Sequence, residues 1–125
     1  MRSLFALVFV ALSSSAGLAF AQPASPFHGT WAVTWEGKKQ VYEARLVLAA
    51  GGGTWKTAAR EKNNPCVGRE VPVKPESATA DEARLVLAFS EAIPGCKDLT
   101  VVLKAAPGGA VTGVRGEFEL TLKRE

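Results

Sequence analysis

Hydrophobic and polar residues alternate with a period of two along most of this chain. Such alternation is typical of β-strands that bury one face, because successive side chains of a strand point to opposite sides of the sheet. Trp31 and Trp35 fall on one face of the first such segment. The last segment has the clearest pattern, since Phe118, Leu120 and Leu122 alternate with polar or charged residues. The pattern therefore predicts a chain built from strands, without a helix.

The expected strands are joined by short turns rich in Gly and Pro. Gly51-Gly52-Gly53 predicts a tight hairpin turn that needs positive φ. The segment 61–82 is the least regular, and Pro72 restricts its one short strand to a sheet edge or a bulge. The seven or eight expected strands cover residues 30–36, 41–48, 54–60, 69–73, 84–89, 99–104, 110–115 and 117–123.

Consecutive strands joined by tight turns predict an antiparallel meander. We expect an all-β fold in which seven to eight strands close into a barrel, because closure removes the exposed edges that an open sheet leaves. The interior of a barrel of about eight strands is either filled by side chains or large enough for one small ligand. The alternative is a two-sheet β-sandwich, which has the same periodicity and stays open at this point.

The first residues have the pattern of a secretory signal peptide. A basic residue precedes an apolar run at 4–12, and Ala19-Phe20-Ala21 follows as a cleavage motif of small residues. We therefore expect a signal peptide at 1–21, a flexible arm at 22–27 and a single barrel domain at 28–125. The apolar run is shorter than the about 20 residues of a membrane-spanning helix, so the mature chain is expected to have no membrane span. The expected location is the periplasm or the extracellular medium.

The chain has two cysteines, Cys66 and Cys96. Paired thiols persist as disulfides in the oxidising compartments to which exported proteins are sent. The sequence has neither the Cys-x-x-Cys motif of a redox catalyst nor the four ligands of a structural zinc site. We therefore predict one structural disulfide between Cys66 and Cys96, and no metal site.

Charge and motif content exclude several classes of function. Fifteen Lys and Arg residues stand against twelve Asp and Glu residues, for a formal net charge of +3, and the charges are interspersed. Without a basic stripe, neither nucleic acid nor anionic lipid is an expected partner. The one histidine, His28, precedes the first strand, and no Gly-x-Ser-x-Gly motif supplies a nucleophile. We therefore expect a protein that is not an enzyme and uses no cofactor.

Two short motifs resemble those of a known superfamily. Gly29-Thr30-Trp31, at the start of the first strand, matches the Gly-Thr-Trp of avidins, and lipocalins open on the related Gly-x-Trp. Thr112-Gly113, in the penultimate strand, is similar to a Thr-Gly in avidin-like strands. In these motifs, in size and in strand count the mature chain resembles the calycin superfamily.

The calycin resemblance implies a specific packing at one end of the barrel. It implies a meander barrel in which Trp31 packs across the closed end, against a late arginine such as Arg115 or Arg124. The polar residues that hold biotin in avidins are replaced here by Ala32-Val33-Thr34-Trp35. Biotin is therefore not the expected ligand.

The chain also resembles, in plan, the small exported inhibitors of serralysin-type metalloproteases. The shared features are a signal peptide, an N-terminal arm, a Gly-x-Trp first strand, an eight-stranded barrel and a single disulfide. In that family the arm enters the protease cleft, so the resemblance implies this role for residues 22–27. The cysteines of this chain lie later than that family places its own.

Two groups of residues are candidates for binding a partner. The first group is aromatic and is expected either to belong to the core or to line a ligand pocket. It consists of Trp31, Trp35, Tyr42 and Trp55. The second group is polar and lies in the two loops that the predicted disulfide would join, where little ordering would be needed to recognise a protein. It consists of Asn63, Asn64, Arg69, Lys97 and Asp98.

Three functions are compatible with these features. The first is an exported binding protein that carries a small apolar ligand in a barrel cavity. The second is a periplasmic or secreted protease inhibitor that acts through its N-terminal arm. The third is a structural or interaction domain of the cell envelope. The sequence specifies neither the ligand or partner nor the oligomeric state.

Overall fold

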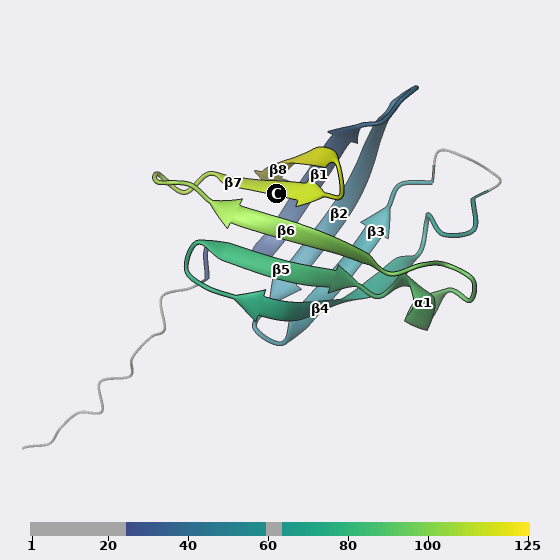
Figure 1. The fold of residues 1–125 in the computed structure, drawn as a ribbon, viewed down its shortest axis with the longest axis horizontal. Helices are drawn as coiled ribbons and strands as arrows, with labels where there is room; N and C mark the ends of the chain where they lie inside the picture. Colours follow the sequence, from purple (N-terminus) through teal and green to yellow (C-terminus); the bar gives the residue numbers. More distant parts are fainter. Residues whose placement is uncertain (1–24, 60–63) are drawn as a thin grey trace, which may run out of the picture.

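The computed structural model describes residues 25–59 and 64–125. These residues form eight antiparallel strands that follow one another around a closed barrel in the order of the sequence (Figure 1). The prediction of an all-β meander closed into a barrel is thus confirmed, and the sandwich alternative is excluded. The elements are β1 (Gly29–Glu36), β2 (Val41–Ala49), β3 (Gly52–Thr57), β4 (Glu70–Ala78), β5 (Glu82–Leu87), α1 (Phe89–Ala92), β6 (Leu99–Ala105), β7 (Val111–Arg115) and β8 (Phe118–Arg124).

Pairing between the first and the last strand closes the barrel. Residues 31–34 of β1 pair with residues 121–124 of β8, whereas β1 pairs with β2 along its whole length. The two ends of the barrel therefore differ. At the closed end β1 begins and β8 ends, next to each other. At the open end the β1–β2 hairpin and the β7–β8 hairpin separate.

Side chains fill the interior of the barrel. The inward positions of the strands carry the apolar residues of the alternating pattern, and these form one continuous core cluster. At most 1% of the surface of Leu46, Trp55, Leu85, Val101 and Leu103 is exposed. The barrel is therefore a packed core along most of its length, one of the two outcomes expected for this number of strands.

The fourth strand is longer than the sequence predicts. The expected strand ended at Val73, but β4 continues to Ala78 and pairs with β5. Its two prolines, Pro72 and Pro75, lie at positions where the pairing of β4 with β5 requires no N–H donor. Pro72 lies opposite Ala88, just past the end of β5, and accepts a hydrogen bond from that residue's N–H. Pro75 lies at a register shift that marks a bulge, as proline in a strand requires.

A single helical turn, α1, interrupts the strands at the open end. Phe89 was expected to continue the strand face of Leu85 and Leu87, but it begins this turn instead and is buried against the core. The Ser90 N–H donates a hydrogen bond to Oδ1 of Asp98 at 2.9 Å. This side chain satisfies one of the N–H groups that the first turn of a helix leaves without a partner.

The predicted disulfide is confirmed. Cys66 and Cys96 are bonded, with their Cα atoms 5.8 Å apart. The bond joins the loop after β3 to the segment before β6, so it fastens two loops of the open end together. A disulfide is consistent with an oxidising compartment.

The closed end is covered by residues that precede β1. Phe27 was expected to end a flexible arm, but only 1% of its surface is exposed, and its carbonyl accepts a hydrogen bond from Nε1 of Trp31 at 2.9 Å. Arg124 lies over the Trp31 indole, with its Cζ 4.2 Å from the ring centroid. Residues 1–24, which include the predicted signal peptide and the first half of the predicted arm, lie outside the described residues.

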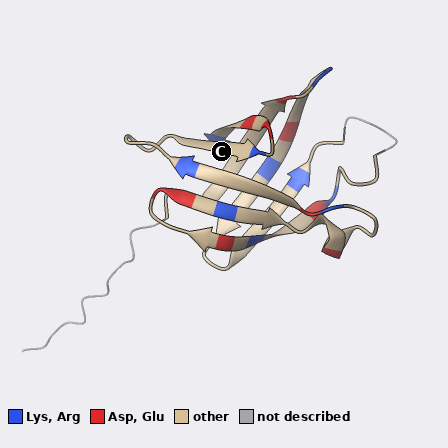
Figure 2. Cartoon of the chain, viewed as in Figure 1, with Lys and Arg blue, Asp and Glu red and all other residues tan. Residues whose placement is uncertain are grey.

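The outer surface carries charges of both signs. Lys and Arg are interspersed with Asp and Glu along the strands (Figure 2). In the part of the chain that the structure describes, no helix has the length and hydropathy to cross a membrane. The eight-stranded antiparallel barrel is consistent with the calycin-type architecture.

Candidate functional site

The open end of the barrel contains a recess of about 280 Å³, which we call the cup. It lies above the packed core, between the disulfide-linked loops and the ends of β1, β6 and β7. Most of its wall is aromatic or apolar, contributed by Trp35, Tyr42, Val67, Phe89, Leu99 and Phe118. The disulfide and a few polar side chains complete the wall, namely Cys66, Cys96, Thr57, Asn64, Lys97 and Arg115.

Three of the predicted aromatic residues form a stack at the base of the cup. Trp35 and Tyr42 face each other across the β1–β2 ladder, and their rings are stacked, with centroids 5.6 Å apart and planes 15° apart. Trp55 lies against Trp35 at 5.9 Å and is buried beneath it, with its Nε1 hydrogen-bonded to Oγ1 of Thr57 at 2.9 Å. Offset aromatic contacts of this kind stabilise a fixed ring geometry. The cup therefore has a rigid aromatic base.

The four predicted pocket residues do not all reach the cup. Trp35 and Tyr42 line it, whereas Trp55 supports it from below. Trp31 lies at the opposite end of the barrel, under Arg124. Trp31 and Trp35 share a strand face, but they are four residues apart on β1, which separates them along the strand by about 13 Å.

Arg115 is a residue of this site that was not among the predicted site residues. On β7 the inward positions are Val111, Gly113 and Arg115, so the arginine occupies the last inward position at the open end. It is partly buried, and its Cζ lies 5.2 Å from the centroid of the Trp35 ring. Burial lowers the pKa of Arg115, because desolvation disfavours the charged form. An arginine nevertheless stays charged at neutral pH.

The predicted partner loops contribute unequally to the cup. Asn64 and Lys97 line it, and Oδ1 of Asn64 also accepts a hydrogen bond from the Cys66 N–H at 3.0 Å. Arg69 is exposed and is not part of the cup wall. Asn63 lies outside the described residues.

Asp98 has a structural role beside the cup. It holds the first turn of α1 through its hydrogen bond with Ser90. The backbone N–H of Ser90, followed by the Ser90 side chain, lowers the pKa of the Asp98 carboxyl, because both stabilise the ionised form. Asp98 therefore fixes the loop between α1 and β6 rather than facing a ligand.

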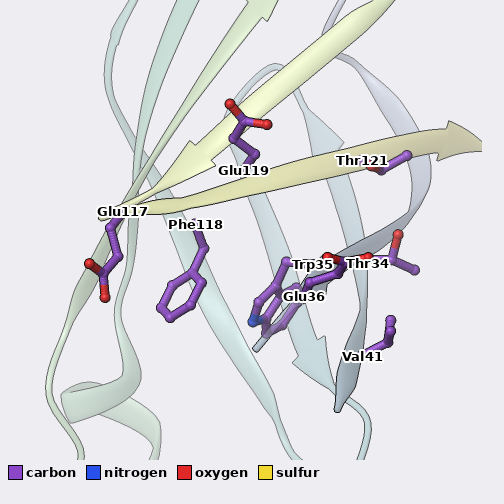
Figure 3. A pocket seen from close by; sticks show the side chains of 8 residues that line it. All are labelled: Thr34, Trp35, Glu36, Val41, Glu117, Phe118, Glu119 and Thr121. Atoms are coloured by element: carbon purple, nitrogen blue, oxygen red, sulfur yellow. The ribbon is translucent and has the colours of Figure 1, made fainter. Parts of the chain in front are cut away.

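A second recess, the notch, lies where β1 and β8 stop pairing (Figure 3). Its volume is about 420 Å³, and three glutamates, Glu36, Glu117 and Glu119, are among the residues that line it. Trp35 and Phe118 line both recesses and therefore separate them. The notch is polar and acidic, whereas the cup is aromatic and carries the cations Arg115 and Lys97.

The described residues form no cluster of the kind that holds a metal ion. Among residues 25–59 and 64–125, no group of three or more His, Cys, Asp or Glu side chains is placed to hold a metal ion. The aromatic rings and the two cations of the cup are groups that bind and orient a ligand rather than transfer protons. The cup is therefore suited to binding.

Comparison with known proteins gives no match: no protein-family model, no curated protein and no solved structure is similar to this chain.

Proposed function

We propose that this protein is an exported, non-enzymatic binding protein that holds a small, flat, largely apolar molecule in the cup. One observation carries the proposal: Trp35, Tyr42 and Phe118 converge on a recess that the packed core does not fill. Aromatic residues that are held rigidly bind flat apolar ligands at a low cost in conformational entropy. The calycin-like Gly29-Thr30-Trp31 motif supports it, since barrels of that superfamily commonly hold ligands at one end.

The size of the cup limits the ligand. Pockets for drug-sized molecules occupy about 300–1,000 Å³, and the cup, at about 280 Å³, lies just below that range. The core beneath it is filled, so the ligand cannot extend deep into the barrel. We therefore propose a ligand of one or two rings, bound at the mouth rather than enclosed in a central cavity.

Titration with 2-naphthamide, an uncharged two-ring probe, tests this proposal. We expect saturable heat in calorimetry, together with amide shifts in NMR spectra that are confined to residues around the cup. Tyr42→Ala and Phe118→Ala should weaken binding by at least about tenfold. Val114→Ala, at an exposed apolar position on the outer face, should not. Absence of saturable binding, or shifts centred on Phe27 at the closed end, would overturn the proposal.

A second proposal is that the chain before the barrel inhibits a protease. The observation that favours it is the anchoring of Pro26 and His28, whose carbonyls accept hydrogen bonds from Arg124 at 2.7 and 2.8 Å. A segment preceding such an anchor would start from a fixed point, which lowers the cost of inserting it into a cleft. A protease inhibitor that acts through this segment would not need the cup. A structural or interaction domain of the cell envelope, the third function considered, would not need it either.

The inhibitor proposal is tested by a deletion that spares the core. Removing residues 22–27 would also remove buried Phe27 and destabilise the barrel, so the informative deletion is 22–24. Loss of inhibition of a secreted metalloprotease, with an unchanged unfolding curve, would support a role for the arm. Equal inhibition by the deleted and intact proteins would contradict it.

A further inference from the structure

The charges at the cup are all of one sign. Arg115 and Lys97 belong to its wall, and none of the described residues on that wall is acidic. The nearest recess, the notch, has the opposite character, since its wall carries three glutamates. A negatively charged ligand is therefore attracted to the cup and repelled from the notch.

Arg115 is the cation best placed to act on a ligand. It occupies an inward position of β7, whereas Lys97 is exposed on a loop. Within the part of the chain that the structure describes, the guanidinium of Arg115 has no carboxylate at ion-pair distance and makes no hydrogen bond. Its neighbour is the face of Trp35. A partly buried arginine with all its N–H donors available is a ready site for an anion.

The arginine at the other end of the barrel provides a comparison within the same molecule. Arg124 also takes an inward position at the end of its strand and also lies over a tryptophan, Trp31. Its donors are used, because Nη1 and Nη2 bond the carbonyls of His28 and Pro26. Arg124 therefore has a structural role, whereas the corresponding donors of Arg115 remain available to a ligand.

We infer that the ligand of the cup is a planar aromatic carboxylate. This inference rests on the proposed function and adds the chemical class of the ligand. The ring would pack against Trp35, Tyr42 and Phe118, and the carboxylate would accept hydrogen bonds from the guanidinium of Arg115. An arginine fork matches a carboxylate in geometry, and such charge-assisted bonds are about twice as strong as neutral ones.

A matched pair of probes separates this inference from the proposed function. 2-Naphthoate and 2-naphthamide have nearly the same shape and differ in charge at neutral pH. We expect the carboxylate to bind at least about tenfold more tightly than the amide, because only the carboxylate carries a charge opposite to that of Arg115 and offers two equivalent oxygens to its fork. Arg115→Gln should weaken binding of the carboxylate much more than binding of the amide, and so remove this preference. Arg115→Lys should retain part of it, since the charge remains but the fork is lost.

Arg84→Gln is the control, because it removes an exposed arginine on the outside of β5 and should leave the preference intact. Unchanged urea unfolding of each variant shows that the barrel is folded. If both probes bind equally to the unaltered protein, or if Arg115→Gln keeps the preference, the inference is wrong while the proposed function stands. If 2-naphthamide shows no saturable binding, the proposed function is itself wrong.

Discussion

Arg124 lies over the indole of Trp31 and donates hydrogen bonds to backbone carbonyls just before β1, so one side chain ties the end of β8 to the start of β1. Its Cζ is 4.2 Å from the ring centroid, and its guanidinium donates to the carbonyls of Pro26 and His28. The calycin resemblance implied that Trp31 packs against a late arginine, either Arg115 or Arg124. The structure assigns that position to Arg124.

Replacing Arg124 should therefore destabilise the barrel at its closed end. We expect Arg124→Gln to lower the free energy of unfolding by about 2 kcal/mol, through the loss of two charge-assisted hydrogen bonds and a cation–π contact. Urea denaturation followed by tryptophan fluorescence measures the change. Lys123→Gln, at the neighbouring exposed position, is the control and should change stability by less than about 0.5 kcal/mol. Equal effects of the two substitutions would show that the Arg124 contacts contribute nothing specific.

Breaking the disulfide should weaken both stability and the cup. The bond between Cys66 and Cys96 closes a loop with a sequence separation of 30. We expect the double variant Cys66→Ser/Cys96→Ser to lose about 3.5 to 4 kcal/mol of unfolding free energy, because the unfolded chain gains entropy. Because both cysteines lie on the cup wall, the folded fraction should also bind 2-naphthamide more weakly. An unchanged urea midpoint would argue against this role.

Two glycines of the Gly51-Gly52-Gly53 turn should respond in opposite ways to substitution by alanine. A Cβ on Gly53 would lie 1.8 Å from the backbone oxygen of Val47, whereas a Cβ on Gly51 would meet nothing within 4 Å. We expect Gly53→Ala to cost at least about 3 kcal/mol, because the β2–β3 ladder must move. Gly51→Ala should be neutral or stabilise the protein by up to about 1 kcal/mol, by restricting the unfolded chain. Thermal unfolding of the two variants distinguishes them, and similar melting temperatures would contradict the prediction.

The hydrogen bond between Ser90 and Asp98 should make the local stability of the loop beside α1 depend on pH in the acidic range. Hydrogen bonds from Ser90 hold the pKa of the Asp98 carboxyl below its ordinary value of 3.8 in the folded protein. A lowered folded pKa means that the stabilisation is present above the unfolded pKa and is lost as pH falls through the folded pKa. We therefore expect the Ser90 amide resonance to shift, and its exchange protection to fall, only below about pH 4.

Asp98→Asn tests the assignment of this transition. The variant should show weaker protection of the Ser90 amide at neutral pH, because a neutral acceptor bonds less strongly than a carboxylate. It should also lack the shift in acid. A transition of the same size in the variant would assign the titration to another group.

The strands were predictable from the sequence because the signal for them is local. Alternation in segments such as 117–123 reports the buried face directly, and Leu120, on the apolar face of that segment, is buried in the structure. The prolines concealed the second half of β4, since their missing N–H groups could be judged only once the bulge and the end of β5 were known. Phe89 continued the alternation but turned into α1, where Asp98 supplies a nonlocal partner.

The candidate site was less predictable because a strand face has two ends. Trp31 and Trp35 share a face, yet one lies under Arg124 at the closed end and the other at the open end beside Arg115. Periodicity identifies the buried face of a strand, but not which end of the barrel is covered by other residues. The sequence does contain one indication of the site: Arg115, a charged residue, occupies an inward position of its strand. Phe118 was visible as an inward residue, but its place at the cup depends on where β8 leaves β1.

The closure of the barrel brings Ser25 and Glu125 to the same end of the molecule, since the Glu125 N–H bonds the Thr30 carbonyl at the start of β1. The cup is at the other end. A fluorescent protein or an affinity handle joined to either residue would therefore leave the mouth unobstructed, and the molecule could be immobilised on a sensor chip with its recess facing the analyte.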